Sequence, residues 1–306
     1  MSRRLLVTGG AGFIGSHLVG RLIEAGERVS VIDDLSRGRR AWLHPEVELH
    51  EADIRDADAV RRAVTATAAD AVVHLAAMHF IPAIEGAPQL ARDVNVNGTR
   101  RLLDALTQHP PALILFASTA AVYPDRRGPI PETCPAQPLD LYGRTKLDGE
   151  LLVADFAAGT GTHCLSARIF NVVGRRETNA HVAVELVDQL RRGNTHVRLG
   201  NLEPRRDYTD VIDVAAALQG LLSAPREGPV TFNVGSGRSV AVADLVRICE
   251  EVLGRPIEVD VDQRRQRSQE RAELVADARL LRSTTGWQPT RSLHETLAEL
   301  LAEPPP

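Results

Sequence analysis

Three glycines, spaced three positions apart, follow an apolar run near the start of the chain, in the stretch LLVTGGAGFIGSHL. The run at residues 5–7 predicts a short buried strand, and from Phe13 onward apolar residues recur at helical spacing. Gly9, Gly12 and Gly15 stand at the junction, where glycine permits a tight turn and lets another molecule approach the backbone closely. The start of the helix offers free N–H groups and the positive end of its dipole, which suit a diphosphate. This segment therefore predicts a strand, a turn and a helix that hold a dinucleotide.

Strand-like and helix-like segments alternate over the first 170 residues. Aliphatic runs predict strands at residues 27–33, 47–49, 70–75, 112–118 and 163–170, and amphipathic patterns predict helices at 56–67, 89–108 and 141–159. Aliphatic strands separated by helices are typical of a parallel sheet that is covered on both faces. We therefore expect an α/β fold with a Rossmann-type doubly wound parallel sheet.

After Gly174 the pattern changes to short strands and helices interleaved with turn signals, such as the run at residues 235–237. We expect a dinucleotide-binding domain at residues 1–174 and a smaller mixed α/β lobe at residues 175–303. The smaller lobe should bind the substrate and form the second wall of a cleft. Segments at about residues 205–235 are expected to return to the first domain.

Composition excludes several classes of function. The 306 residues include 36 Lys and Arg against 40 Asp and Glu, and the net charge of −4 argues against a nucleic-acid partner. The three cysteines are far apart and show no metal-ligand spacing, so neither a metal site nor a disulfide framework is expected. The longest apolar stretch, at residues 112–122, is too short to span a bilayer, and the N-terminus leaves no room for a signal peptide. We expect a cytoplasmic protein with no membrane partner.

An acidic residue ends the second predicted strand. Asp33 follows Gly15 by 18 residues, at the place where a carboxylate receives the ribose hydroxyls of NAD. A carboxylate there repels the extra phosphate of NADP, so NAD is favoured as the cofactor. Arg37, Arg39 and Arg40 argue the other way, since an arginine could accept that phosphate, but the carboxylate is given more weight.

A tyrosine and a lysine four residues apart predict acid–base chemistry. Tyr142 and Lys146 lie on one face of the predicted helix, and Ser118 and Thr119 end the preceding strand. A lysine ammonium near a tyrosine hydroxyl stabilises the phenolate and lowers the pKa of the tyrosine from about 10 toward neutral pH. Tyr142 is therefore a candidate general base for a substrate hydroxyl. The alternative is an ordinary amphipathic helix start.

These features together resemble the extended short-chain dehydrogenase/reductase family. The matching motifs are TGGAGFIGSHL at residues 8–18, Asp33, HLAAM at 74–78, NVNGT at 95–99, STAAVY at 118–123 and YGRTK at 142–146. RIFNVVG at 168–174 and RRDYTDVIDVA at 205–215 resemble the nucleotide-sugar branch of that family. The resemblance runs from Leu5 to about Trp287, and the nearest functional match is the NAD-dependent epimerase of the UDP-glucose 4-epimerase type.

The resemblance implies which residues hold NAD. Phe13 and Ile14, with the three glycines, should wrap the pyrophosphate, and Asp33 should meet the adenosine ribose. The other implied cofactor contacts are Asp34, Ser36, Arg37 and Gly38 around that ribose, Asp53 and Ile54 at adenine, Leu75, Ala76 and Ala77 along the cofactor, Asn95 beneath it, and Tyr142 and Lys146 at the nicotinamide ribose.

The resemblance also implies a substrate side. Asn171, Arg206 and Arg267 should contact the diphosphate, with Arg264 or Arg271 as substitutes for Arg267. The remaining expected substrate residues are Thr119 at the sugar, Val197 and Leu199 beside the base, Tyr208 next to Arg206, and His79, which either meets the sugar or is a plain loop histidine. Leu274 falls roughly where some 4-epimerases carry a bulky tyrosine, which hints at room for a larger sugar.

The implied reaction is a transient oxidation at C4 of a nucleotide-diphosphate sugar, with a UDP-sugar favoured. Tyr142 removes the proton of the 4-hydroxyl with the help of Thr119, hydride passes to NAD, and the 4-keto sugar turns over before hydride returns to its other face. The catalytic set is Thr119, Tyr142 and Lys146.

Related activities require residues that this sequence lacks beside Thr119. Dehydratases carry an Asp-Glu pair after the catalytic threonine, decarboxylases a glutamate and fucose-forming enzymes a nearby cysteine, whereas Thr119 is followed by Ala120 and Ala121. Other epimerases of uronic, N-acetylated or heptose sugars, a ketosugar reductase, a dehydratase and a non-catalytic NAD-binding regulator stay open. The family commonly dimerises through two long helices, here at residues 89–108 and 141–159, so a homodimer is expected.

Overall fold

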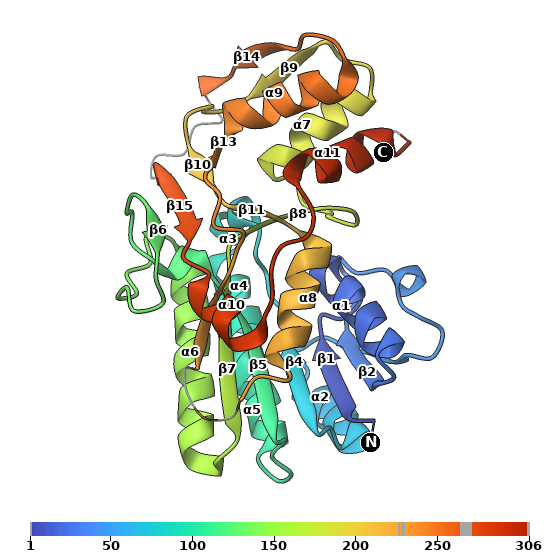
Figure 1. Cartoon of the computed structure of the whole chain (residues 1–306). Coiled ribbons are helices and arrows are strands. Elements are labelled where there is room, and N and C mark those ends of the chain that lie inside the picture. Colours follow the sequence, from blue (N-terminus) through green and yellow to red (C-terminus); the bar gives the residue numbers. More distant parts are fainter. Residues whose placement is uncertain (1, 226, 228–229, 264–270, 305–306) are drawn as a thin grey trace.

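The aliphatic runs of the first half of the chain pair in a seven-stranded parallel sheet with the order β3-β2-β1-β4-β5-β7-β12 (Figure 1). The computed structural model describes residues 2–225, 227, 230–263 and 271–304. The strands of this sheet are β1 (Arg4–Thr8), β2 (Arg28–Asp33), β3 (Glu48–Glu51), β4 (Ala71–His74), β5 (Leu113–Thr119), β7 (His163–Ile169) and β12 (Thr231–Val234). The strand order reverses between β1 and β4, and ligands of such sheets bind outside the carboxyl ends of the strands at that point. The predicted doubly wound α/β fold is confirmed.

Helices cover both faces of the large sheet. On one face α1 (Phe13–Glu24) packs against α8 (Val211–Leu221), and the other face carries α2 (Ala57–Thr67), α5 (Thr99–Leu106) and α6 (Leu141–Thr160). The central strand is therefore buried on both faces, and Leu5, Leu6 and Val7 are each fully buried. Burial on both faces explains why these strands read as unbroken aliphatic runs.

The helix predicted at residues 89–108 contains a π-helical turn. After the short helix α3 (Ile81–Gly86), α4 (Pro88–Arg92) leads into the π turn η2 (Asp93–Gly98), and α5 continues from it. A π turn widens the helix locally and changes where its side chains point. This turn contains the buried Asn95. Two 3-10 turns, η1 (Arg40–Trp42) and η3 (Ala120–Val122), follow β2 and β5.

The later part of the chain builds a second hydrophobic core. There α7 (Val182–Arg191), α9 (Val242–Leu253) and α11 (Leu293–Ala302) pack around the paired strands β9 (His196–Leu199) and β14 (Glu258–Val261). Figure 1 shows these elements beyond the carboxyl ends of the large sheet, at the end opposite the N-terminus. They form the smaller mixed α/β part that the sequence predicted.

Short strands lie between the two cores. β10 (Arg205–Arg206) pairs with β13 (Val240–Ala241) and with β15 (Glu273–Ala276), and β15 also pairs with β6 (Pro129–Ile130). β8 (Asn171–Val173) pairs with β11 (Tyr208–Asp210), and α10 (Arg279–Thr285) packs near β12. The chain thus passes between the two parts several times, and the predicted boundary at residue 174 stays a prediction. Within the described ranges, every helix is too short or too polar to cross a bilayer.

Candidate active site

The glycine turn between β1 and α1 packs tightly against the end of β4. Gly9 has a φ of +70°, and a Cβ atom there would lie 2.7 Å from the backbone nitrogen of Ala76. A Cβ atom on Gly15 would lie 2.1 Å from the carbonyl oxygen of Gly9. Both positions therefore require glycine, one for its conformation and both for space. The turn brings the end of β1 and the residues after β4 together, and the role of these residues as a dinucleotide cradle stays a prediction.

The start of α1 has the features of an anion site. Gly12 is the N-cap residue, and no side chain makes a capping hydrogen bond there. The backbone N–H groups of the first turn, which includes Phe13 and Ile14, therefore stay without a helical acceptor. A helix start of this kind favours phosphate oxygens.

Asp33 organises the loops beside this turn. Its Oδ2 atom accepts the N–H of Ala11 at 2.9 Å, and its Oδ1 atom accepts the N–H of Leu35 at 2.9 Å. Burial raises the pKa of Asp33, and these two backbone donors oppose the rise. Asp34 accepts from both the backbone nitrogen and the hydroxyl of Ser36, at 3.0 and 2.6 Å. The contact of Asp33 with a ribose stays a prediction.

The loop that follows Ser36 closes over the glycine turn. A Cβ atom on Gly38 would lie 2.8 Å from the backbone of Ala11, so the loop lies directly on the turn, and Arg37 is exposed beside it. After β3, Arg55 donates to both carboxylate oxygens of Asp53 and lowers the pKa of that carboxyl. Ile54 is buried, and a Cβ atom on Gly98 would lie 2.7 Å from its side chain. The adenine role of these two residues stays a prediction.

A buried hydrogen-bond chain fixes the segment after β4. The hydroxyl of Thr8 accepts the N–H of Ala76 at 3.2 Å and lies 2.6 Å from Nδ1 of His74. The hydroxyl of Thr99 donates to the carbonyl oxygen of Asn95 at 2.7 Å, so it accepts from Nε2 of His74 at 2.9 Å. His74 is therefore neutral, with its proton on Nε2, and burial lowers its pKa to about 3. The chain links the ends of β1 and β4 to α5 and positions residues 75–77 beside the glycine turn.

Asn95 ties this segment to α6. Its Oδ1 atom accepts the N–H of Met78 at 2.7 Å, and its Nδ2 atom donates to the Met78 carbonyl oxygen at 2.9 Å. The same Nδ2 atom donates to the hydroxyl of Thr145 at 3.0 Å, and that hydroxyl donates to the carbonyl oxygen of Tyr142. The amide thus holds the loop after β4 against the first turn of α6. It acts as a positioning residue beneath the site.

The structure brings Thr119, Tyr142 and Lys146 together at the carboxyl end of β5. Thr119 is the last residue of β5, and its side chain hydrogen-bonds to that of Tyr142. Lys146 follows one turn along α6 and is 3 % exposed. A Cβ atom on Gly143 would lie 2.3 Å from the carbonyl oxygen of Ala121, so only glycine lets the start of α6 approach the loop after Thr119 so closely.

The pKa values of the tyrosine and lysine differ from the sequence-based expectation. Burial raises the pKa of Tyr142 to about 12, and the hydrogen bond from Thr119 opposes the rise. Burial lowers the pKa of Lys146 to about 7, and the charge of Glu150 opposes the fall. The prediction that Lys146 lowers the pKa of Tyr142 is therefore wrong for the side chains alone. Desolvation is the largest cause of both shifts.

Arg271 clamps the loop after β5 to the start of α6. Its Nη2 atom donates to the carbonyl oxygens of Ala121 and Tyr123 at 2.9 and 3.2 Å, and its Nη1 atom lies 3.3 Å from Oδ2 of Asp140. The other oxygen of Asp140 caps α6 by accepting the N–H of Gly143 at 2.7 Å. Arg271 is thus committed to protein contacts, which argues against its use as the substitute diphosphate arginine.

A buried ion pair lies one turn beyond Lys146. Glu150 accepts from Nε and Nη2 of Arg168 at 2.9 and 2.7 Å and also from the hydroxyl of Ser118. The Arg168 guanidinium lies 4.8 Å from the centre of the Tyr123 ring. This network was not predicted from the sequence, although an arginine inside the aliphatic run of β7 is a signal for a buried partner.

The substrate-side residues fall into two groups. Asn171 and Tyr208 are neighbours in the pairing of β8 with β11, and Arg206 stands on β10, where its Nη1 atom donates to the carbonyl oxygen of Arg271 at 2.9 Å. These three residues lie beyond the carboxyl ends of the large sheet. Their contact with a diphosphate stays a prediction.

Val197 and Leu199 lie elsewhere. Both side chains are fully buried in the second core, because β9 turns one face to α7 and α9, and their predicted place beside a base stays a prediction. Leu274 is also buried on β15. Arg264 and Arg267 lie outside the described residues.

His79 belongs to a polar cluster that the sequence did not reveal. It follows the loop held by Asn95, and its Nε2 atom lies 3.1 Å from Nδ2 of Asn179. Glu177 and His181 complete the cluster from the segment before α7. About 100 positions separate the two segments, and neither shows a spacing that would link them.

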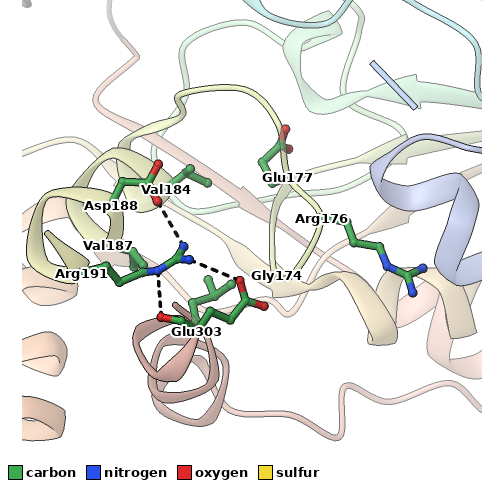
Figure 2. Close-up of a pocket in the computed structure, with 9 residues that line it drawn as sticks. Gly174, Arg176, Glu177, Val184, Val187, Asp188, Arg191 and Glu303 are labelled. Atoms are coloured by element: carbon green, nitrogen blue, oxygen red, sulfur yellow. Dashed lines mark hydrogen bonds and ion pairs between the residues drawn. The ribbon is translucent and has the colours of Figure 1, made fainter. Parts of the chain in front are cut away.

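A small cavity lies on the other side of that segment. It has a volume of about 130 Å³ and is lined by Gly174, Arg176, Glu177, α7 residues and the end of α11. Figure 2 shows Arg191 paired with Asp188, one turn away on α7, and with Glu303 after α11. The predicted catalytic residues do not line it.

The sequence matches one protein family and several relatives of known activity. The NAD dependent epimerase/dehydratase family matches residues 5–235. A UDP-glucose 4-epimerase from Corynebacterium glutamicum is 34 % identical over 97 % of this chain and 94 % of its own length. A UDP-arabinose 4-epimerase from Arabidopsis thaliana is 30 % identical over 97 % of this chain and 77 % of its own length.

Solved structures agree with these relatives. A UDP-glucose 4-epimerase from Thermotoga maritima, with UDP-glucose, superposes with a TM-score of 0.90 at 29 % identity and 97 % coverage of both chains. A UDP-glucose 4-epimerase from Thermus thermophilus, in complex with NAD, gives the same TM-score, identity and coverage. This chain thus shares its fold with these two structures along almost its whole length, and one of the two holds NAD.

Proposed function

The chain belongs to the NAD dependent epimerase/dehydratase family, and we propose that it interconverts two nucleotide-diphosphate sugars that differ at C4. UDP-glucose and UDP-galactose are the favoured substrate pair. The observation that carries the proposal is the hydrogen-bonded pair of Thr119 and Tyr142 beside the buried Lys146, at the same sheet edge as the glycine turn.

The residues around the glycine turn fit NAD. The tight turn at Gly9, the uncapped start of α1 and the buried Asp33 form a cradle for a pyrophosphate and its ribose. Residues 75–77, Tyr142 and Lys146 would line its nicotinamide half. Bound NAD supplies a reversible acceptor for the hydride of C4. The protein supplies position and proton transfer.

Tyr142 is the proposed acid–base group. Its hydroxyl faces Thr119, so a sugar hydroxyl that replaces or shares this contact would lie within reach of proton transfer. Thr119 is itself fixed, because its hydroxyl accepts the N–H of Ala121 at 3.2 Å. Lys146 is placed to stabilise the phenolate when it forms.

The surroundings of Thr119 favour epimerisation over water elimination. Ala120 and Ala121, which follow it, are buried, and neither can donate or accept a proton through its side chain. A dehydratase would need an acid and a base at these positions. Asn171, Arg206 and Tyr208 are the proposed contacts of the nucleotide diphosphate, and Arg267 is kept as a sequence-based candidate.

The curated relatives differ in the sugar, so the substrate must be tested directly. Proton NMR would follow UDP-glucose with the purified protein and catalytic NAD, and the growth of the UDP-galactose anomeric signal to a constant ratio is expected. UDP-arabinose, a UDP-uronic acid and a UDP-N-acetylhexosamine would be run in parallel. The Tyr142→Phe variant serves as the matched control. Spectra that stay unchanged with every sugar would contradict an epimerase.

We also expect a homodimer. Figure 1 shows α5 and α6 along one side of the large sheet, where a second copy could pack against them. Sedimentation of the wild-type protein and of Leu151→Arg, which changes a leucine of α6 that is 59 % exposed, would test this arrangement. An unchanged dimer in the variant would place the interface elsewhere.

A further inference from the structure

Two histidines and a glutamate from two distant segments converge beside the candidate active site. His79 lies in the loop after β4, and Glu177 and His181 lie between β8 and α7. One imidazole nitrogen from each histidine and one carboxylate oxygen of Glu177 lie within 4.8 Å of one another. The sequence predicted no metal site, because ligands separated by about 100 positions form no spacing motif.

The ring of His79 is oriented as a metal ligand would be. One ring nitrogen donates to the carbonyl oxygen of Ala77, and Nε2 lies 3.1 Å from the Asn179 amide, which donates to it. A backbone acceptor on one ring nitrogen fixes the tautomer and leaves a lone pair on the other. An amide nitrogen can only donate, so the Nε2 atom that receives it carries this lone pair.

Glu177 carries a buried negative charge. Its side chain is 4 % exposed, and its Oε1 atom accepts from the backbone nitrogen and the amide of Asn179 at 2.8 and 3.0 Å. Among the described residues, no lysine or arginine forms an ion pair with it, and Nε2 of His181 lies 4.0 Å away. Figure 2 shows Glu177 pointing away from Arg191, whose guanidinium pairs with Asp188 and Glu303. A buried carboxylate of this kind needs a compensating positive charge.

His181 is held in place by aromatic contacts. Its ring stacks on that of His79, with centres 5.7 Å apart and planes at 26°, and meets the edge of Phe80 at 5.5 Å. His181 is the N-cap residue of α7, so its backbone position is set by that helix. The three candidate ligands are therefore largely preorganised.

We propose that His79, Glu177 and His181 bind one divalent cation of the zinc class. Two imidazoles and one carboxylate are a common ligand set for zinc, with bonds of about 2.1 Å and remaining positions for water. Ligand atoms would move together by about 1 Å, and the Asn179 amide would rotate away from His79. The charge of the cation offsets that of Glu177, while the nearby cations Lys146 and Arg37 act against it. The ion would tie the loop after β4 to the segment before α7, on the two sides of the candidate active site.

The test is a titration of untagged protein, with its NAD bound, by Zn²⁺ in an isothermal calorimeter. We expect one saturable site per chain, and we expect Glu177→Gln and His181→Ala each to weaken it by at least ~10-fold. The matched control is His196→Ala, because His196 also pairs with a glutamate, Glu258, at 2.6 Å but on the exposed surface. This control should bind Zn²⁺ like the wild-type protein.

A second readout separates lost binding from lost folding. Co²⁺ added to the wild-type protein should give visible absorption bands of a tetrahedral or five-coordinate site, and Zn²⁺ should abolish them. Circular dichroism of His181→Ala, whose side chain is 35 % exposed, should match that of the wild-type protein. The proposal is overturned if the wild-type protein shows no saturable site, or if the binding survives in His181→Ala and Glu177→Gln. The experiment needs no sugar, so its outcome is independent of the proposed function.

Discussion

The Nζ atom of Lys146 lies 4.3 Å from the centre of the Phe116 ring, and the ring forms one wall of the space in which this lysine is buried. A cation over an aromatic face keeps some stabilisation in a site that excludes water. The contact does not offset burial, which lowers the pKa of Lys146 to about 7. The fold therefore holds a basic group that titrates near neutral pH next to Tyr142.

We predict that the buried lysine costs stability at neutral pH. Its folded pKa of about 7 is below the ordinary lysine value of 10.5, so between these values the unfolded chain binds more protons and the free energy of unfolding rises with pH. Lys146→Met lacks this dependence. It should be more stable than the wild-type protein at pH 7, and the difference should shrink by about 1 kcal/mol for each pH unit up to pH 9. Urea unfolding at several pH values, on proteins matched for bound NAD, measures this difference.

One result for Lys146→Met would contradict this prediction. A constant difference in the free energy of unfolding between pH 7 and pH 9 would mean that the pKa of the lysine is not lowered by its site. The same variant should lose most of its epimerase activity, because the phenolate of Tyr142 would lack its cation.

We predict that Tyr142→Phe lowers kcat by at least ~100-fold, since it removes the proposed acid–base group. Thr119→Val should lower kcat less, because Tyr142 keeps its hydroxyl but loses its hydrogen-bond partner. Tyr123→Phe is the matched control: it also removes a buried tyrosine hydroxyl, which donates to Asn233 at 2.7 Å outside the site. It should reduce stability and keep activity. Equal kcat losses in Tyr142→Phe and Tyr123→Phe would contradict the assignment of Tyr142.

We predict that Asn95→Ala loosens the site as well as the fold. The substitution removes three hydrogen bonds, leaves the N–H of Met78 without its acceptor, and takes from the Thr145 hydroxyl the donor that it accepts from. We expect a loss of about 2 kcal/mol in the free energy of unfolding, and a fall in kcat that exceeds any change in KM. Asn97→Ala, in the same π turn but exposed and bonded only to Asp93, should change neither quantity. A fall in stability without a fall in kcat would limit Asn95 to a structural role.

Much of this architecture could be predicted from local sequence patterns. The strands and helices of the large sheet read clearly because burial on both faces makes each strand aliphatic. The glycine turn and the Tyr142–Lys146 spacing are likewise local, so both could be found without knowledge of the fold. The π turn could not, since its buried Asn95 contacts Met78 and Thr145, which no local pattern links to it.

Residues defined by tertiary packing were predicted less well. The burial of Val197 and Leu199 in the second core follows from the alternation of β9, and their motif position alone did not indicate it. The pKa shifts of the catalytic pair had the wrong sign for Tyr142, because a sequence gives the neighbours of a side chain but not the extent of its burial. The cluster of His79, Glu177 and His181 depends on the approach of two loops.

The buried ion pair between Glu150 and Arg168 gives the last prediction. Both side chains are about 10 % exposed or less, and Glu150 also receives the hydroxyl of Ser118. Glu150→Gln leaves the guanidinium of Arg168 buried without its counter-charge, so we expect a loss of about 3–5 kcal/mol in the free energy of unfolding. The double variant Glu150→Leu with Arg168→Met removes both charges and should recover a large part of that loss. Urea unfolding of the single and double variants measures the coupling, and losses that simply add would show that the two charges do not depend on each other.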